Sequence, residues 1–419
     1  MSQALRNVVP WVVRGLTYEI QRGDYSVGSN VRDAACYVMW SFARMPNPES
    51  RRVFGEMSLQ MSTTLISVAV FDRESNVRRA ASAAFQEHVG RHSLFPHGIS
   101  VLQLADFFSV GNMRNAFVVS SRKIAEYSEY RQPLLHHLCT GTIYHWEYRT
   151  RELAAAALRE SAPLAAQYVV EDLLPQIAAN TTSPFLAVRH GAILATGVVA
   201  EVLAAELRDC NKSTKQHQQI VTKHIVVETS GSSRENFVRA LSALKGYDVF
   251  ETLCRFIVEG AKVEIRRNAS AALGEYCRGV YNNEDNDGDV DAADSRADMV
   301  MAIDALLDGL LDHTVDNRGD VGSWVRKQCL ISLADMFKAN PALLSALSPD
   351  HGFALRLIGR TLHAATEKID KLRLAAGRLL ETLIYQQNRS GMDLRIKRIV
   401  DHLGQYISVQ ERQTNKEDR

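Results

Sequence analysis

Residues 72–85 read DRESNVRRAASAAF, a polar turn followed by a segment with small residues at regular intervals. Within this stretch, Ala81, Ala84 and Phe85 follow Arg78 at offsets of three, six and seven. Side chains at those offsets share one face of an α-helix. Alanines on that face allow a second helix to approach closely, so the stretch predicts a helix packed against a neighbour.

The same pattern recurs along the chain: an arginine, often after an aliphatic residue, precedes small or apolar side chains at the same offsets. Clear copies start at Arg32, Arg78, Arg151, Arg189, Arg266, Arg326 and Arg373, and weaker ones at Arg114 and Phe237. A second amphipathic helix precedes several copies, as in residues 167–177. The usual spacing matches HEAT and armadillo repeats of roughly 40–47 residues. We therefore predict an all-α fold, a HEAT/armadillo-type helical-repeat solenoid.

The recurring arginine has two interpretations. In stacked helical pairs, such a side chain bonds acids and carbonyl oxygens in the turn of the neighbouring repeat. Alternatively, it contacts a partner protein directly. Because the arginines form a regular series, we favour the architectural role.

Two segments interrupt the repeat. Residues 282–298 contain seven acidic residues against one base and have no hydrophobic period, which predicts an acidic inserted loop. Residues 410–419 contain no apolar side chain, so we expect a disordered tail over 409–419. Helical repeats are expected over 1–281 and again over 299–408.

Composition narrows the class of partner. The chain has 49 Lys and Arg against 48 Asp and Glu, so no broad positive field is available for nucleic acid or anionic lipid. Charged residues interrupt the most apolar segment, 185–205, which argues against membrane insertion. The six cysteines form no CxxC pair and are expected to be buried thiols in a reducing compartment. We expect a cytoplasmic protein.

Catalytic motifs are not found in the sequence. It contains no phosphate-binding glycine loop, no nucleophile elbow and no HExxH zinc motif. His88 and His92 could share a helix face, but no third ligand is recognisable. We therefore predict no enzyme activity, no cofactor and no metal. One calcium-loop alternative stays open, with candidate positions Asn283, Asp285, Asp287, Gly288, Val290 and Asp294.

Several ordered fragments go beyond a generic repeat. Residues 26–37 read SVGSNVRDAACY, residues 76–87 read NVRRAASAAFQE, and residues 316–326 read DNRGDVGSWVR. Together with shorter stretches between them, these fragments resemble the tubulin-folding cofactor D family of tubulin-specific chaperones. The resemblance covers most of this chain and the middle part of a typical, much longer family member.

The resemblance implies a protein that binds β-tubulin and helps assemble or disassemble α/β-tubulin heterodimers in the cytoplasm, at the microtubule cytoskeleton. It implies cooperation with tubulin-folding cofactors E and C and an Arf-like small GTPase. It also implies that GTPase activation is a property of the assembly and not of this chain alone. The alternative is a generic helical-repeat interaction scaffold of the transport or phosphatase-scaffold type.

Turn residues are the candidate contacts for a partner, because a solenoid of helical pairs offers an extended concave surface bordered by its turns. Trp146 and Trp324 are the aromatic anchors expected at interaction hot spots. For Asp320 and Trp324 a structural alternative is equally open, in which Asp320 caps a helix and Trp324 packs between repeats. The predicted partner-facing residues are Asp72, Arg73, His145, Trp146, Asp316, Arg318, Asp320 and Trp324.

Overall fold

The structure is a computed structural model and describes residues 2–22, 25–45, 47–202, 249–260, 262–280, 291–340, 343 and 351–385. Its contacts divide the chain into two compact units, Met1–Val202 and Leu203–Arg419. The division falls inside the array of repeats expected over 1–281, so that array is split between the two units. Both units are built from helices, which confirms the all-α helical-repeat prediction.

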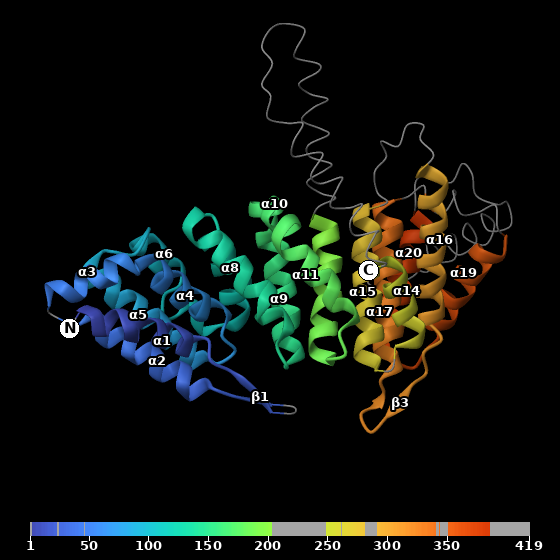
Figure 1. Cartoon of the computed structure of the whole chain (residues 1–419). Coiled ribbons are helices and arrows are strands. Elements are labelled where there is room, and N and C mark those ends of the chain that lie inside the picture. The colour runs from blue at the N-terminus through green and yellow to red at the C-terminus, as the bar shows by residue number, and fades with distance from the viewer. Residues whose placement is uncertain are drawn as a thin grey trace, which may run out of the picture. The chain divides into compact units, whose positions relative to one another are not determined.

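Unit 1 is a series of helical pairs that follow one another in chain order from blue to green in Figure 1. Two short strands form a hairpin between its first two helices, and the last helix covers residues 186–202. Its first elements are α1 (Ser2–Leu16), β1 (Ile20–Arg22), β2 (Tyr25–Val27), α2 (Ser29–Ala43), α3 (Pro48–Glu56), α4 (Ser58–Phe71), α5 (Ser75–His92) and α6 (Gly98–Leu104). They are followed by η1 (Ser109–Gly111), η2 (Asn115–Ser120), α7 (Ser121–Ile124), α8 (Ser128–Thr140), η3 (Thr142–Tyr144), α9 (Tyr148–Ser161), η4 (Ala162–Ala165), α10 (Ala166–Tyr168), η5 (Val169–Leu173), α11 (Leu174–Ala179) and η6 (Asn180–Thr182).

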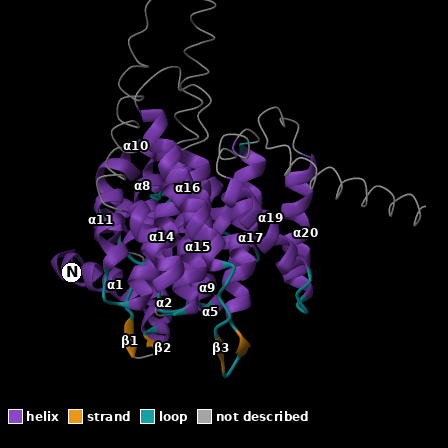
Figure 2. Cartoon of the chain, turned by 90° about the vertical axis from the view of Figure 1, so that its right-hand side faces the viewer, coloured by secondary structure: helices purple, strands orange, loops and turns teal. Residues whose placement is uncertain are grey.

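Unit 2 repeats the plan with longer helices. A second two-stranded hairpin stands between two of them, drawn in orange in Figure 2. The described elements are α14 (Val249–Glu259), α15 (Val263–Val280), α16 (Asp291–Gly309), β3 (Val315–Asp316), β4 (Gly319–Asp320), α17 (Gly322–Ala339), α19 (His351–Ala365) and α20 (Asp370–Tyr385). The arginine-bearing helices stack in chain order, α15 on α17 and α17 on α20.

The small residues after each arginine form the core, as predicted. In α5, Ala81, Ala84 and Phe85 are fully buried, and α5 packs against α2. In α15, Ala269, Ala272 and Leu273 are equally buried where the helix meets α17. The weaker copy at Phe237 lies outside the described residues.

The arginines connect successive helical pairs. Arg78 donates to the carbonyls of Asp72 and Arg73 in its own turn, and to those of Val110 and Gly111 in the next turn. Arg32, Arg266 and Arg326 instead reach carboxylates of the next turn: Asp72 at 2.6 Å, Asp312 at 2.7 Å and Glu367 at 3.3 Å. This pattern confirms the architectural role of the series.

One helical pair of unit 1 is irregular, and this irregularity shapes the candidate site. Its first helix, α6, is only seven residues long and packs on α5 and α7. The first helix of the preceding pair, α4, therefore packs directly on α8, the first helix of the following pair. Turns that belong to alternate pairs are thereby brought next to each other.

The segment expected as an acidic loop is partly helical. Helix α16 begins at Asp291, so the backbone over 291–298 is helix and the expected loop end at 298 is wrong. Residues 281–290 lie outside the described residues, as does the tail 409–419, and with them most of the calcium-loop candidates.

Five cysteines of the described part, Cys36, Cys139, Cys254, Cys277 and Cys329, are free and buried, as expected. Burial raises the pKa of the Cys36 thiol to about 12. No single described helix is long and apolar enough to cross a membrane. Only α3 and α4 taken together reach the length and apolar composition of a membrane span, and the chain bends by 72° between them.

Candidate functional site: two turn clusters

The predicted partner-facing residues gather in two places, one in each unit. Asp72, Arg73, His145 and Trp146 meet in unit 1, although the two halves of this group are 73 residues apart in sequence. Because α4 packs directly on α8, the turn after α4 lies beside the turn before α9. The other four residues lie in unit 2, on the β3–β4 hairpin and the first turn of α17.

The Arg73 cluster consists of Arg73, Glu74, Trp146 and Glu147. The Arg73 guanidinium pairs with Glu74 at 2.7 Å and with Glu147 at 2.9 Å, and its carbon lies 4.9 Å from the centre of the Trp146 ring. Arg73 is about one-third exposed, whereas the Trp146 Nε1 atom is buried and has no hydrogen-bond partner among the described residues. The cluster therefore presents a cation stacked on an indole and fixed by two acids.

Asp72 does not face a partner. Its side chain is 5% exposed and accepts hydrogen bonds from Arg32 at 2.6 and 3.3 Å and from the Glu74 backbone N–H at 2.8 Å. Burial raises the pKa of the Asp72 carboxyl, and the neighbouring Arg32 guanidinium opposes that shift. Asp72 thus holds the turn against α2, and Arg73 is the residue that reaches the surface.

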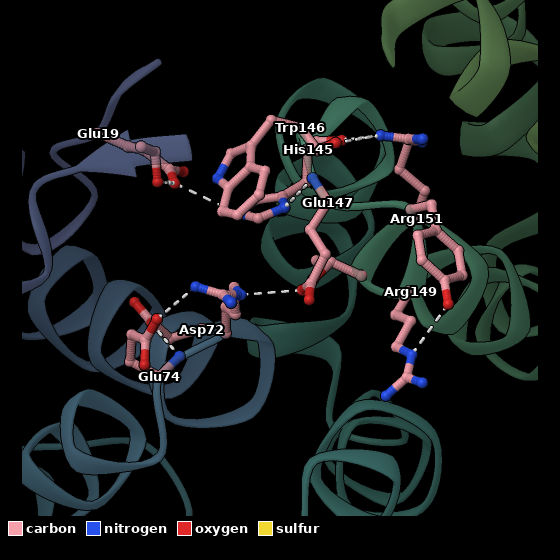
Figure 3. Close-up of polar contacts among 12 residues, drawn as sticks. Glu19, Asp72, Glu74, His145, Trp146, Glu147, Arg149 and Arg151 are labelled. Atoms are coloured by element: carbon pink, nitrogen blue, oxygen red, sulfur yellow. Dashed lines mark hydrogen bonds and ion pairs between the residues drawn. The ribbon is translucent and has the colours of Figure 1, made fainter. Parts of the chain in front are cut away.

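His145 ties this turn to the first hairpin. Its Nε2 lies 3.3 Å from a Glu19 carboxylate oxygen, and its Nδ1 accepts the Glu147 backbone N–H at 3.1 Å (Figure 3). Burial alone would raise the pKa of Glu19, but hydrogen bonds from His145 and Ser26 outweigh it and lower that pKa to about 2. Beneath these contacts lies a cavity of about 450 Å³, lined by Glu19, Asp72, Arg73, His145 and Trp146 among others.

The Arg318 cluster in unit 2 consists of Glu264, Asp316, Arg318 and Trp324. Arg318 pairs with Asp316 at 2.6 Å and with Glu264 at 2.7 Å, and its guanidinium carbon lies 5.0 Å from the centre of the Trp324 ring. Hydrogen bonds from Arg318 lower the pKa of Asp316. Trp324 is 37% exposed and is not packed between helical pairs.

Asp320 has the structural role given above as the alternative, in which it caps a helix. Its Oδ1 accepts the Ser323 backbone N–H at 3.0 Å in the first turn of α17, and its Oδ2 accepts from Arg326 at 2.8 Å. The Arg326 bond lowers the pKa of Asp320. The carboxylate thus joins the hairpin to the buried Arg326 guanidinium.

Four acids that contact these residues were missed by the sequence analysis. Glu74 directly follows Arg73, and Glu147 directly follows the His145–Trp146 pair, so adjacency could have suggested both. Glu19 and Glu264 come from distant segments, and no local pattern signals them. In the described part of the chain, no group of three or more His, Cys, Asp or Glu side chains could hold a metal ion. What the clusters offer is a fixed cation on an aromatic ring, a surface suited to protein contact.

Comparison with known proteins finds similarity over part of the chain. Residues 1–99 match the family model "Tubulin-specific chaperone D-like, ARM repeats". Part of the chain is thus similar to tubulin-specific chaperone D proteins. It is 38% identical over 213 residues to Tubulin-specific chaperone D of Dictyostelium discoideum, a match covering 50% of this chain and 14% of that protein. It is 32% identical over 154 residues to Tubulin-folding cofactor D of Schizosaccharomyces pombe, covering 37% of this chain and 14% of that protein.

The matched part is thus a small fraction of each chaperone D relative's own length. Among solved structures, the karyopherin Kap121p bound to the extreme C-terminus of Cdc14p aligns with 97% of this chain and 48% of its own. That alignment has 12% identity and a TM-score of 0.40. The helical-repeat assignment rests on the chain's own elements and on the family match.

Proposed function

We propose that this chain is a tubulin-binding segment of a tubulin-folding cofactor. It binds β-tubulin and helps to assemble or disassemble α/β-tubulin heterodimers, together with cofactors E and C and an Arf-like small GTPase. The observation that carries the proposal is the sequence similarity to chaperone D proteins from two organisms. The proposed role is binding without catalysis, in the cytoplasm, and any GTPase activation belongs to the whole assembly.

The two turn clusters supply the contact residues in this proposal. Arg73 with Trp146, and Arg318 with Trp324, each place a cation against an indole at a turn. Tryptophan and arginine are the residues that most often dominate binding energy at interfaces. The acids that hold each guanidinium leave less side-chain freedom to lose on binding. Asp72, His145 and Asp320 act indirectly, by fixing the turns.

Arg318 is the better residue for a test, because both the guanidinium and its neighbouring indole are exposed. The chain should retain soluble tubulin heterodimer on beads, and the double variant Arg318→Glu/Trp324→Ser should retain several-fold less. Asp320 is left intact, because replacing it would also disturb Arg326 and the start of α17. Circular dichroism should show unchanged helicity for the double variant.

A matched control is Arg360→Glu, which removes another exposed ion pair of unit 2, with Asp308 at 2.9 Å, away from any tryptophan contact. This control should retain tubulin like the parent chain. If the parent chain does not retain tubulin, the proposed function is wrong for this segment. If the parent binds and the Arg318/Trp324 variant binds equally well, the family role survives but this cluster is not the contact.

A further inference from the structure

Two adjacent phenylalanines lie exposed in the turn between α6 and η1. Phe107 is 50% exposed and Phe108 is 84% exposed. The value for Phe108 is the largest of any large hydrophobic side chain in the described residues. Their rings meet nearly edge to face, with centroids 5.7 Å apart. Neither ring is covered by a helix of unit 1, so two aromatic surfaces are left open to solvent.

The guanidinium of Arg79 is fixed beside these rings. Its carbon lies 4.5 Å from the centre of the Phe107 ring. On another side it meets Gly111, where a Cβ atom would lie 2.8 Å from Nη2 and 3.4 Å from Nε. The absence of a side chain at Gly111 therefore allows this close approach. Arg79 makes no hydrogen bond or ion pair with any residue in the described ranges, and its Nε is a buried donor without an acceptor.

No carboxylate among the described residues forms an ion pair with the Arg79 guanidinium. Arg78 bonds only carbonyl oxygens, and its pKa is lowered by burial and by the charge of Arg79, with Asp72 opposing. Asp106, the acid of this turn, already accepts the backbone N–H groups of Phe108 at 3.0 Å and Ser109 at 2.6 Å.

Arg114 is a second unpaired arginine of this part of unit 1, six residues after Phe108 and directly before η2. It is exposed, and it forms no hydrogen bond or ion pair with the described residues. Most other exposed arginines of unit 1 differ in this respect: Arg91, for example, pairs with Glu87 on the same helix. Of these two unpaired guanidinium groups, that of Arg79 is the one that contacts the open phenyl rings.

We infer that the Phe108 patch, defined as Arg79, Phe107 and Phe108, docks an acidic protein segment that carries bulky apolar side chains. Carboxylates of the segment would accept charge-assisted hydrogen bonds from Arg79. Its apolar side chains would cover the Phe107 and Phe108 rings and remove that surface from water. This inference does not depend on the tubulin relationship, because it rests on the charges and rings of this turn alone.

Charge complementarity favours an acidic peptide over a nucleic acid. The free guanidinium group of Arg79 can neutralise few phosphates, and binding to a polyanion scales with the number of such contacts. The whole chain, with 49 basic and 48 acidic residues, adds no long-range positive field. An acidic segment with two apolar side chains matches both halves of the patch.

The test measures fluorescence anisotropy of the full chain with a labelled octapeptide, Gly-Asp-Asp-Leu-Leu-Asp-Asp-Gly. Two further peptides, one with asparagine for each aspartate and one with serine for each leucine, separate the charge from the apolar contribution. The acidic-leucine peptide should bind and the two substituted peptides should bind at least about tenfold more weakly, equivalent to about 1.4 kcal/mol. Arg79→Gln and Phe108→Ser should each weaken the acidic-leucine peptide to a similar degree.

Matched controls keep the comparison within the chain. Arg91→Gln removes an exposed arginine that is already paired, and Phe185→Ser removes a 73% exposed phenylalanine of another turn. Both should bind the peptide like the parent chain. The proposal is overturned if the three peptides bind alike or if Arg79→Gln and Phe108→Ser, with parental helicity, bind like the parent. It is also overturned if a ten-nucleotide oligouridine binds more tightly and displaces the peptide.

Discussion

The Arg73 cluster and the Arg318 cluster contain the same kinds of side chain but differ in how their tryptophans are held in the fold. In each, a guanidinium lies about 5 Å from a tryptophan ring and pairs with two acids. In unit 1 the tryptophan comes from a turn 73 residues away and its Nε1 is buried. In unit 2 the tryptophan is six residues away and lies exposed. One cluster therefore joins two turns through a partly buried tryptophan, whereas the other connects an exposed hairpin to the first turns of α15 and α17.

The largest difference should appear when the acid beside each cluster loses its charge. Asp72→Asn leaves the buried Arg32 guanidinium without its counter-charge, and removing one partner of a buried pair costs about 3–5 kcal/mol. Asp320→Asn should cost only about 1 kcal/mol, because an amide oxygen still caps α17 and Arg326 keeps Glu367. Hydrogen exchange measured peptide by peptide would report each unit separately.

Protection should fall across α2, α4 and α5 in Asp72→Asn and stay at the parental level in α17 and α20. Equal losses of protection in the two variants would show that the Arg32–Asp72 pair is no more important than the half-exposed Asp320 contact.

The tryptophans should give the next largest difference. Trp146→Ala opens a gap between the turns that follow α4 and α8, and we expect a loss of about 2–3 kcal/mol, below the range for a fully buried aromatic. Trp324→Ala removes a partly exposed ring from the first turn of α17 and should cost about 1 kcal/mol or less. Urea unfolding followed by circular dichroism would rank the two variants. A larger loss of stability for Trp324→Ala than for Trp146→Ala would contradict the conclusion that Trp146 is the more important of the two for stability.

Acid should weaken unit 1 through His88, which is 1% exposed and bonds the Met39 carbonyl at 2.9 Å. Burial lowers the pKa of His88 from 6.5 to about 4. Between these two pH values the unfolded chain binds a proton at His88 and the folded chain does not. Stability is therefore complete above pH 6.5 and falls as the pH drops toward 4, by about 2 kcal/mol at pH 5.

The variant His88→Phe keeps an aromatic ring among Phe54 and Phe95 but removes the titrating group. It should be less stable than the parent at pH 7, since the Met39 carbonyl loses its donor, and its stability should depend less on pH between 7 and 5. An unchanged slope of stability with pH would mean that His88 does not titrate on unfolding.

The sequence was sufficient for features that repeat. The offsets after Arg78 and Arg266 place their alanines in the core, and the arginine series connects consecutive turns as inferred. Features set by a single irregularity were not predictable. The short helix α6 brings the turn at Arg73 to Trp146, and no residue in either turn signals that α4 and α8 touch.

The two hairpins were also missed for a physical reason. Strands β1 and β2 have three residues each, β3 and β4 two, and nearly all of their side chains are exposed, so no alternating pattern marks them. Only Gly319, with its φ of 99°, marks the turn of the second hairpin, since that backbone conformation favours glycine. A turn position alone does not reveal which carboxylates form bonds within the fold, so the sequence could not show that Asp72 is buried against Arg32 or that Asp320 bonds Arg326.

The smallest effects on stability should come from replacing Arg73 and Arg318 themselves. The ratio of these two effects is the most direct test of the difference between the clusters. Arg73→Gln breaks ion pairs that hold two separate turns together, and a half-exposed pair of this kind contributes about 1 kcal/mol or less. Arg318→Gln breaks exposed ion pairs within the hairpin and between the hairpin and the first turn of α15, and we expect no measurable change in Tm or in exchange of α17. High salt should reduce the effect of Arg73→Gln, because screening weakens the parental ion pairs. If Arg318→Gln destabilised the chain as much as Arg73→Gln, the ion pairs of the hairpin would stabilise unit 2. The main role of Arg318 would then be structural and not the binding of a partner.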